Sequence, residues 1–360
     1  MDNQQIASYI SSGITRMIHA VRSETVLDWR EKRFLLRQTR IQKRKIRCRN
    51  RQNVHVPPFL IASITERCNL HCTGCYARGC GFCTDAPKRE MLSLTDWQRI
   101  FHEADAAGVS FILLTGGEPL MNREIIELAA RERNLIFPVF TNGTLLNESV
   151  ISLFVSSRNL FPVFSLEGSR ETTDRRRGQG VFAACTNAAE SLRQNGVLFG
   201  ISITVSRDNL QELTSETFLP LLQSIGPSVV FLIEYTATSD GDKDKELTAA
   251  DRQAVADWLT KARITARSIW FMSFPGDEEL MGGCLAAGRG FFHINPYGDA
   301  EPCPFAPVSA CNLKTASLTD ALQSPLFYHL SASGMLADTH DGGCALAGKK
   351  DQIEALLVQK

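Results

Sequence analysis

The sequence predicts an α/β protein whose main body is a partial (β/α)6 barrel of the TIM type. Three observations lead to this fold class. Apolar runs of strand length alternate with helical segments from residue 59 to residue 274. Basic residues gather before that stretch, and Gly, Pro and Cys dominate after it. We therefore expect a basic helical N-terminal extension over 1–54, the barrel over 55–275 and a small C-terminal domain over 276–360.

The N-terminal extension carries most of the charge asymmetry of the chain. Residues 1–51 hold 13 Lys and Arg against 4 Asp and Glu, which leaves 26 against 35 for residues 52–360. The segment from Ser23 to Arg51 has the pattern of a long, polar, basic helix that ends before two prolines. One interpretation is a solvated helix that docks on the acidic body. The other is a helix that binds a nucleic acid, an anionic membrane surface or an acidic peptide.

The barrel is predicted from seven apolar strands that alternate with helices. The expected strands are Phe59–Ile64, Ser110–Thr115, Leu135–Thr141, Leu160–Leu166, Leu198–Val205, Val229–Tyr235 and Ser268–Phe274. The expected helices are Trp97–Ala107, Arg123–Arg133, Ser149–Ser156, Val181–Gln194, Ser215–Ser224 and a helix from Thr248 to about Ala266. This order predicts parallel pairing, with six βα units and a seventh strand.

Two absences in the sequence indicate the compartment. The longest apolar runs reach only strand length, whereas a transmembrane helix needs about 20 apolar residues. The first 25 residues lack the apolar segment and cleavage site of a secretory signal. Most of the eleven cysteines are clustered, which in such a chain favours metal ligation in a reducing compartment over disulfides. We therefore expect a cytoplasmic metalloprotein.

The loop after the first strand contains the most informative motif, CxxxCxxC, formed by Cys68, Cys72 and Cys75. A [4Fe–4S] cluster normally takes four thiolates. Three thiolates leave one iron with an open position, where a substrate or cofactor can bind. A zinc site needs a fourth ligand and usually shows CxxC pairs, so a zinc knuckle is the weaker alternative.

At this point the sequence resembles the radical S-adenosylmethionine (SAM) superfamily, whose signature is this cysteine loop after the first barrel strand. The resemblance implies that the three cysteines hold a [4Fe–4S] cluster at the catalytic centre. The next strand ends fit as well, because active sites of such barrels lie at the C-terminal ends of the strands. Thr115-Gly-Gly-Glu-Pro119 looks like the GGEP motif of the family. The residues that the resemblance assigns to SAM are Gly116, Gly117, Glu118, Pro119, Thr141, Asn142, Ser165, Glu167 and Arg177.

Two residues depart from the family pattern. Relatives often carry an aromatic residue where this chain has Gly74, so another group has to pack against the adenine, and Tyr76 is the candidate. The family commonly has Asp at the position of Glu167.

Arg177 resembles the arginine that holds the SAM carboxylate in relatives with a SPASM or twitch extension. A guanidinium group suits a carboxylate because it offers paired donors.

The C-terminal region resembles that SPASM or twitch extension, which binds auxiliary iron–sulfur clusters. Cys284 is followed by 13 residues, Gly298, four residues and Cys303, as in the opening pattern of the extension. A full SPASM domain has seven cysteines. Here four remain, which implies a truncated version with one auxiliary [4Fe–4S] cluster held by Cys284, Cys303, Cys311 and Cys344.

Cys80 and Cys83 form a CxxC pair that the family pattern does not need. Three roles stay open for them: a thiol pair that faces the substrate, a cluster ligand supplied across the domain interface, or packing as small apolar residues.

The resemblance implies reductive cleavage of SAM at the barrel cluster. The products are methionine and a 5′-deoxyadenosyl radical, which takes a hydrogen atom from a peptide, a protein or a small molecule. It also implies an electron donor such as flavodoxin or ferredoxin. Two alternatives remain: a radical SAM enzyme recruited to RNA or to a membrane surface by the basic helix, and a non-catalytic iron–sulfur electron carrier.

Overall fold

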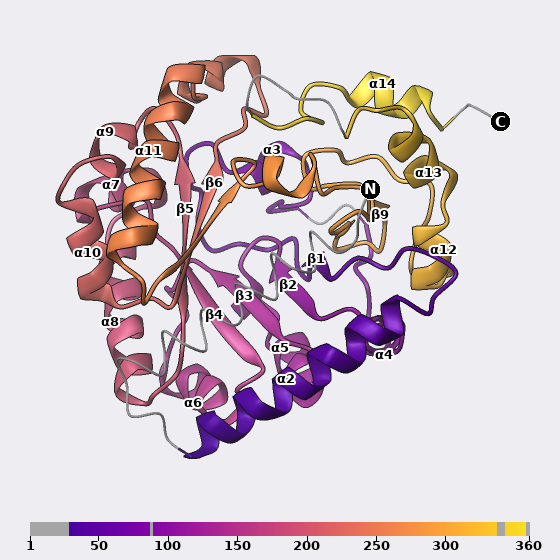
Figure 1. The fold of residues 1–360 in the computed structure, drawn as a ribbon, viewed down its shortest axis with the longest axis horizontal. Coiled ribbons are helices and arrows are strands. Elements are labelled where there is room, and N and C mark those ends of the chain that lie inside the picture. Colours follow the sequence, from indigo (N-terminus) through magenta and orange to yellow (C-terminus); the bar gives the residue numbers. More distant parts are fainter. Residues whose placement is uncertain (1–28, 87–88, 337–342, 358–360) are drawn as a thin grey trace.

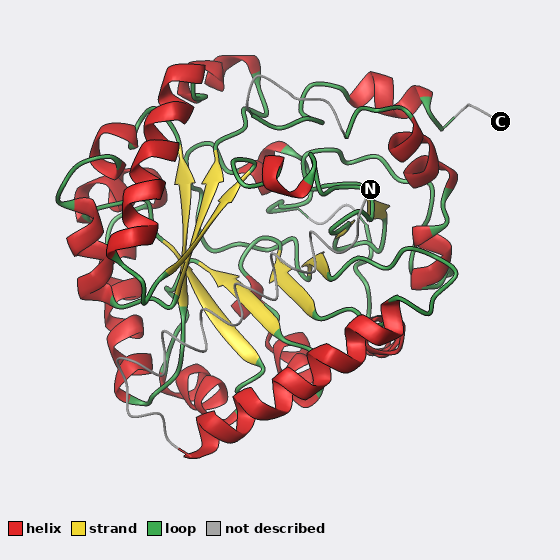
Figure 2. Cartoon of the chain, viewed as in Figure 1, coloured by secondary structure: helices red, strands yellow, loops and turns green. Residues whose placement is uncertain are grey.

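The protein is built around a single nine-stranded sheet, as the computed structural model of residues 29–86, 89–336 and 343–357 shows (Figures 1 and 2). The strand order is β7-β6-β5-β4-β3-β2-β1-β8-β9, and every neighbouring pair is parallel except β8 with β9. The strands are β1 Phe59–Ser63, β2 Phe111–Thr115, β3 Phe137–Thr141, β4 Leu160–Ser165, β5 Gly200–Val205, β6 Val229–Glu234, β7 Trp270–Phe274, β8 His293–Ile294 and β9 Ala300–Glu301. The sheet curves into a barrel that does not close.

Helices cover the outer face of the curved sheet (Figure 2). Those of the barrel are α3 Tyr76–Gly79, α4 Leu94–Ala107, α5 Arg123–Arg131, α6 Glu148–Ser156, α7 Arg170–Arg177, α8 Val181–Gln194, α9 Leu210–Leu213, α10 Phe218–Ile225 and α11 Ala249–Thr265. The chain also forms α2 Trp29–Arg49 before the barrel and α12 Leu318–Leu322, α13 Pro325–Ala332 and α14 Lys350–Ala355 after it. The predicted alternation of strands and helices is confirmed, and so is the partial barrel.

Local sequence sets the ends of these helices. Ser93 and Asp96 form a capping box that starts α4, and Gly108 ends it in the left-handed conformation. Thr248 and Asp251 form the same capping box at the start of α11. Each box satisfies backbone N–H groups that the first turn of a helix otherwise leaves without a partner.

Alternate residues of each strand face opposite sides of the sheet. In β1, Leu60 and Ala62 are fully buried against the outer helices, whereas Phe59 and Ile61 face the lumen and keep part of their surface accessible. The same alternation holds in β2 for Ile112 and Leu113. The continuous core therefore lies between the sheet and its helices, and the lumen is a separate space.

The C-terminal region joins the barrel through the sheet itself. Strand β8 pairs in parallel with β1, so that Ile61 lies opposite His293. The ring of His293 is fully buried: Nε2 lies 2.8 Å from Ser63 Oγ and Nδ1 lies 2.7 Å from a carboxylate oxygen of Glu301. The sheet thus continues across the boundary expected at residue 275. The division into three domains stays a prediction.

Helix α2 packs across the loops that precede β2 and β3. The Lys45 ammonium is buried, donates to the carbonyl of Val109 at 2.5 Å and lies 2.8 Å from Asp105. Arg49 donates to the carbonyl of Gly108 at 2.6 Å. Burial lowers the pKa of Lys45 to about 8, with Asp105 opposing the shift. One face of this basic helix is therefore docked on α4 and the adjoining loop. The first part of the predicted helix, Ser23–Asp28, lies outside the described residues.

Candidate functional site

The three thiols of the CxxxCxxC motif lie in one loop between β1 and α3 and line one cavity. Cys68, Cys72 and Cys75 are each partly accessible. A hydrogen bond from the Cys83 thiol lowers the pKa of Cys68 to about 6, although burial acts in the opposite direction. Burial raises the pKa of Cys72. The loop thus presents three sulfur atoms to a common space, which suits a cluster that needs three protein ligands.

Gly74 has a physical reason to lack a side chain. Its φ is +64°, and a Cβ atom there would lie 2.7 Å from the hydroxyl of Tyr235. Tyr235 follows β6, so the aromatic ring at this position comes from across the barrel mouth. Tyr76, which we expected to pack against the adenine, instead has its ring between Phe82 and Phe305, with centroids 5.7 and 5.4 Å away. The ring that lies against Gly74 is thus that of Tyr235, and which ring packs against the adenine stays a prediction.

The GGEP loop runs beside the start of the cysteine loop. A Cβ atom at Gly117 would lie 2.0 Å from the carbonyl oxygen of Arg67, and one at Gly116 would lie 2.3 Å from that of Thr65. The Gly117 N–H donates to the Thr65 carbonyl at 2.9 Å. The resemblance assigns both glycines to SAM, which stays a prediction. What they accommodate in this structure is the backbone of the cysteine loop.

Glu118 joins the second and third strand ends. Its carboxylate accepts hydrogen bonds from the Thr141 hydroxyl and the Asn142 N–H, both at 2.7 Å, and from the Leu120 N–H at 3.1 Å. Burial raises the pKa of Glu118 to about 7, against these donors. Pro119 is buried at the first position of a short 3-10 helix. Glu118 therefore fixes the ends of the second and third strands relative to each other, and it also lines the cavity.

Glu167 binds two neighbouring arginines at the fourth strand end. Its Oε1 accepts from Arg176 and from Nε of Arg177 at 2.6 Å, and its Oε2 accepts from the Thr204 N–H at 3.0 Å. Both arginines lie in the last turn of α7, a helix that the sequence analysis did not predict. Arg176 also donates to the Thr204 hydroxyl at 2.9 Å, so this network ties α7 to β5.

The cavity mouth brings together six of the nine residues that the resemblance assigns to SAM, whereas Pro119, Thr141 and Glu167 are not among its lining residues. Its lining includes Gly116, Gly117, Glu118, Asn142, Ser165 and Arg177, beside Cys68 and Cys72. The amide of Asn142 donates to Asn69, which holds it beside the cysteine loop. The hydroxyl of Tyr235 is buried without a hydrogen-bond partner, which leaves a polar atom for a ligand at this mouth. The donor and acceptor set fits an aminoacyl nucleoside; the individual roles stay predictions.

Three of the four C-terminal cysteines line the same cavity as the cysteine loop. Cys284, Cys303 and Cys344 all line it, and burial raises the pKa of each thiol, with the neighbouring thiolates adding to the shift at Cys284 and Cys303. Cys80 lies in the same group: its pKa is raised to about 12 by burial, then by Glu301 and by the charge of Cys344.

Cys311 lies apart from these thiols. Its pKa is raised by burial and by Asp320, with no contribution from another cysteine. Its N–H donates to Ser309. Among the described residues, no three His, Cys, Asp or Glu side chains are close enough to hold a single metal ion. A four-iron cluster separates its ligands more widely than one ion does. The three thiols that line the cavity, Cys284, Cys303 and Cys344, therefore suit a cluster, whereas Cys311 is not among the lining residues; its role as a ligand stays a prediction.

Part of the barrel is similar to a known protein family. Residues 62–215 match the sequence profile of the Radical SAM superfamily. The chain is 28% identical over 285 residues to an AdoMet-dependent heme synthase of Methanosarcina barkeri, covering 71% of this chain and 80% of that protein. It is 29% identical over 263 residues to the mycofactocin maturase MftC of Mycobacterium ulcerans, covering 69% of each.

A solved structure shows the same fold. Streptococcus suis SuiB bound to S-adenosylmethionine aligns with a TM-score of 0.65 at 20% identity, over 94% of this chain and 83% of that one. Within the ranges that the structure describes, no helix has the length and apolar character needed to cross a bilayer.

Proposed function

Starting from a radical SAM domain over residues 62–215, we propose that the protein is an enzyme that cleaves SAM reductively and uses the product to abstract hydrogen from a substrate. The observation that carries this function is the meeting of Cys68, Cys72 and Cys75 with the GGEP loop at one cavity mouth. When bound, a [4Fe–4S] cluster supplies the electron and the open iron position for SAM.

The residues of this chain hold and orient the two groups. Cys68, Cys72 and Cys75 are the cluster ligands. Arg177 uses Nε and Nη2 on Glu167, which leaves Nη1 for the carboxylate of SAM. Asn142 and Ser165 offer polar atoms for the ribose, and the hydroxyl of Tyr235 offers one more partner across the mouth.

The enclosing barrel protects this chemistry from water. Glu118 and Glu167 are each 1% exposed, so the two carboxylates whose hydrogen bonds hold the cavity mouth together are shielded from solvent. A site that excludes water limits side reactions of a reactive intermediate. We expect anaerobically reconstituted and reduced protein to release methionine and 5′-deoxyadenosine from SAM. Reduced protein that carries the cluster and releases neither product would refute the function.

For the auxiliary cluster we propose the ligands Cys80, Cys284, Cys303 and Cys344. Cys80 replaces Cys311 in the set expected from the sequence, because its thiol lies within the electrostatic influence of Cys344 and that of Cys311 does not. The packing of Tyr76 against Phe305 supports the same assignment, since it joins α3 to the loop after Cys303. A ligand from the barrel loop would connect the two cluster sites through a few residues.

The relatives leave two classes of substrate for this protein: peptides, as the name of the PqqA peptide cyclase of Granulibacter bethesdensis suggests, and small molecules, as that of the heme synthase does. The shape and polarity of the cavity bear on this choice.

A further inference from the structure

The barrel lumen is an apolar cavity that extends from the cysteine loop to helix α2. Its volume is about 460 Å³, and both ends of the same strand line it, from Phe111 at the start of β2 to Thr115 at its end. Four residues of an extended strand span about 13 Å. The cavity therefore continues well below the mouth where the residues assigned to SAM lie.

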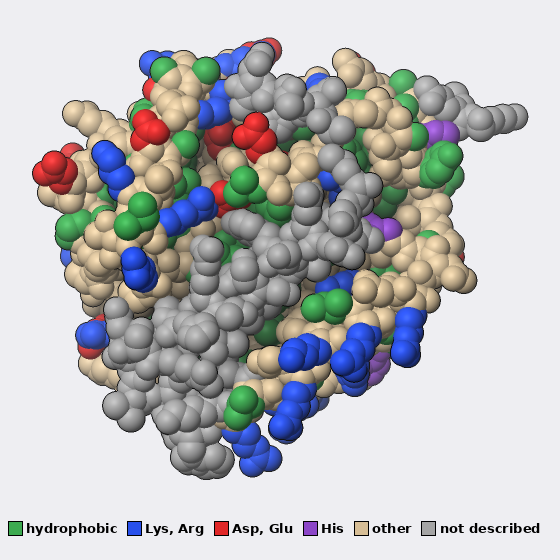
Figure 3. Space-filling view, viewed as in Figure 1, with side chains coloured by type: hydrophobic (Ala, Val, Ile, Leu, Met, Phe, Trp, Pro, Cys, Tyr) green, Lys and Arg blue, Asp and Glu red, His purple; other side chains and the backbone are tan. Residues whose placement is uncertain are grey.

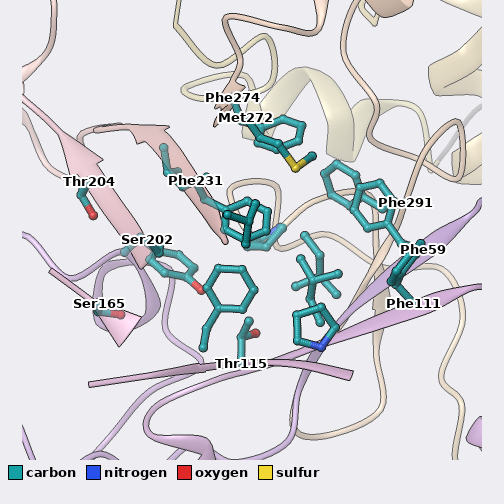
Figure 4. Close-up of a pocket in the computed structure, with 18 of the residues that line it drawn as sticks. Phe59, Phe111, Thr115, Ser165, Ser202, Thr204, Phe231, Met272, Phe274 and Phe291 are labelled. Atoms are coloured by element: carbon teal, nitrogen blue, oxygen red, sulfur yellow. The ribbon is translucent and has the colours of Figure 1, made fainter. Parts of the chain in front are cut away.

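Aromatic side chains from opposite sides of the barrel point into this space (Figure 4). In closed barrels the lumen is filled by packed side chains. Here Phe111 and Phe231 remain partly accessible, although their neighbours Ile112 and Leu232 are at most 1% exposed on the helix side. Accessible apolar surface inside a cavity is unfavourable in water and favours an apolar ligand.

The polar groups of the lining argue against a peptide or a ring with several carboxylates in the lumen. Arg176 and Arg177 are bound to Glu167 at the mouth, where we assign the remaining Nη1 of Arg177 to SAM. Arg158 donates to the carbonyl of Gly196 at 2.8 Å. Hydroxyl groups such as that of Ser202 lie on the wall formed by β4 and β5 (Figure 4). A peptide backbone or a carboxylate needs more partners than these when it leaves water.

Helix α2 adds a basic surface at the far end of the cavity. Phe34 and Gln38 of α2 line the lumen beside the strand starts. The solvent face of the same helix is basic (Figure 3). Leu36 of this helix is 57% exposed. The exposed basic residues are Arg33, Arg37, Arg40, Lys43, Arg44 and Arg47. At an anionic membrane each such residue contributes about 1 kcal/mol of attraction.

We propose that the lumen binds the long acyl or isoprenoid chain of an anionic lipid, taken from a membrane surface on which the basic face of α2 docks. The chain would run from α2 towards the cysteine loop, with its head group at the basic face. This substrate class rests on the proposed function, since it concerns the same cavity.

The first test measures chain binding with cis-parinaric acid, a fluorescent long-chain carboxylic acid, on the full-length reconstituted protein. Leu113 faces the lumen from the middle of β2, and Leu113→Trp fills that space. We expect saturable binding to the unmodified protein and a dissociation constant raised about tenfold or more in Leu113→Trp. The matched control is Leu94→Trp on the exposed start of α4, which should bind like the unmodified protein.

Thermal unfolding and iron content show whether the lumen variant has folded, and Ile61→Phe from β1 serves as a second lumen variant. Absence of saturable binding, or unchanged binding in both folded lumen variants, would overturn the inference. The release of 5′-deoxyadenosine is measured on the same preparation. If no 5′-deoxyadenosine were released, the proposed function would be refuted. Binding of cis-parinaric acid does not depend on that release, so it tests separately whether the lumen binds a long chain.

The second test concerns the source of the chain. The protein should sediment with vesicles of phosphatidylglycerol and phosphatidylcholine but not with phosphatidylcholine alone, and the double variant Arg40→Glu with Lys43→Glu should lose this retention while it still binds cis-parinaric acid. Binding of the probe without retention on the anionic vesicles would overturn the membrane source. If the protein were retained on RNA but not on the anionic vesicles, the membrane source would likewise be overturned.

Discussion

Arg177 and Glu167 form a buried ion pair, with Nη2 of the arginine 2.5 Å from Oε1 of the carboxylate and with side chains 13% and 1% exposed. Arg176 binds the same oxygen. Together these contacts fix the end of α7 against the cysteine loop, where the Thr73 N–H donates to the carbonyl of Arg176 at 3.0 Å. The guanidinium group of Arg177 is thus held in one orientation before any ligand binds.

Arg177→Ala should raise the dissociation constant for SAM about tenfold or more, because a charge-assisted contact contributes roughly 1.5–3 kcal/mol. Arg175→Ala is the matched control on the same helix, since Arg175 donates only a 3.4 Å hydrogen bond to the carbonyl of Asp208. Calorimetry on the reconstituted protein gives both values. Equal affinities in the two variants would move the carboxylate contact away from Arg177.

Cys72→Ala should abolish release of 5′-deoxyadenosine, because two thiolates do not retain the cluster that SAM needs. Cys48→Ala tests the loss of a cysteine on α2, where the thiol donates to the carbonyl of Ala106, and should leave the rate unchanged. Product release under anaerobic reduction is followed by chromatography. A rate for Cys72→Ala equal to that of Cys48→Ala would rule out the barrel cluster as assigned.

The chain should hold two clusters, or about eight iron atoms. The triple variant Cys68/Cys72/Cys75→Ala should keep about half of them. In that background, Cys80→Ala should lower the remaining iron and Cys311→Ala should not. Iron analysis and Mössbauer spectroscopy measure both. An iron-free triple variant would show that the auxiliary cluster does not exist. If Cys311→Ala lowered the remaining iron and Cys80→Ala did not, Cys311 would return to the ligand set in place of Cys80.

Gly117→Ala should destabilise the protein by about 1–3 kcal/mol and impair loading of the barrel cluster, because the new Cβ would overlap the carbonyl of Arg67 at the start of the cysteine loop. Gly241→Ala is the control, since a Cβ there meets nothing within 4 Å. Urea unfolding and iron content are compared for the two variants. Normal loading in Gly117→Ala would mean that the two loops can separate without loss of the site.

Glu118 should make stability depend on pH. Its pKa rises from 4.5 to about 7 on folding, so between these values the folded protein binds the proton more tightly than the unfolded chain. The free energy of unfolding of the apoprotein should therefore fall by about 3 kcal/mol as the pH rises through this window. Glu118→Gln should remove this decrease, and Glu171→Gln on the surface of α7 should not. Urea unfolding at about pH 5 and about pH 8 gives the change in the free energy of unfolding. The same change in the unmodified protein, Glu118→Gln and Glu171→Gln would contradict the assignment to Glu118.

The sequence predicted the barrel well because its strands are apolar runs separated by amphipathic helices, and local pattern suffices for both. It missed α7, because Arg170–Arg177 has no apolar periodicity and is held by buried Thr173 and Asp174. In hindsight, Ser169 before the segment and Gly178 after it fit the ends of a helix. It left three roles open for Cys80, one of them a cluster ligand supplied across the domain interface, since only tertiary structure brings this residue near Cys344.

Tyr235 illustrates the same limit within the site. Gly74 departs from the family pattern, and from the sequence we named Tyr76 as the ring that replaces the missing one, whereas the ring that lies against Gly74 is that of Tyr235. The two residues are far apart in the chain and meet only because β6 ends opposite the cysteine loop. The absence of a side chain at Gly74 was the one available signal.

The pairing of β1 with β8 has a consequence for the order in which the protein folds. Strand β1 is synthesised long before its second neighbour, β8, which contains His293. Until then one edge of β1 has unpaired N–H and C=O groups, which can pair with another chain. We expect the barrel to become resistant to proteases only after residue 294 has left the ribosome, because contacts between distant segments form slowly. Nascent chains stalled before β8 should therefore be the form that chaperones bind and that aggregates.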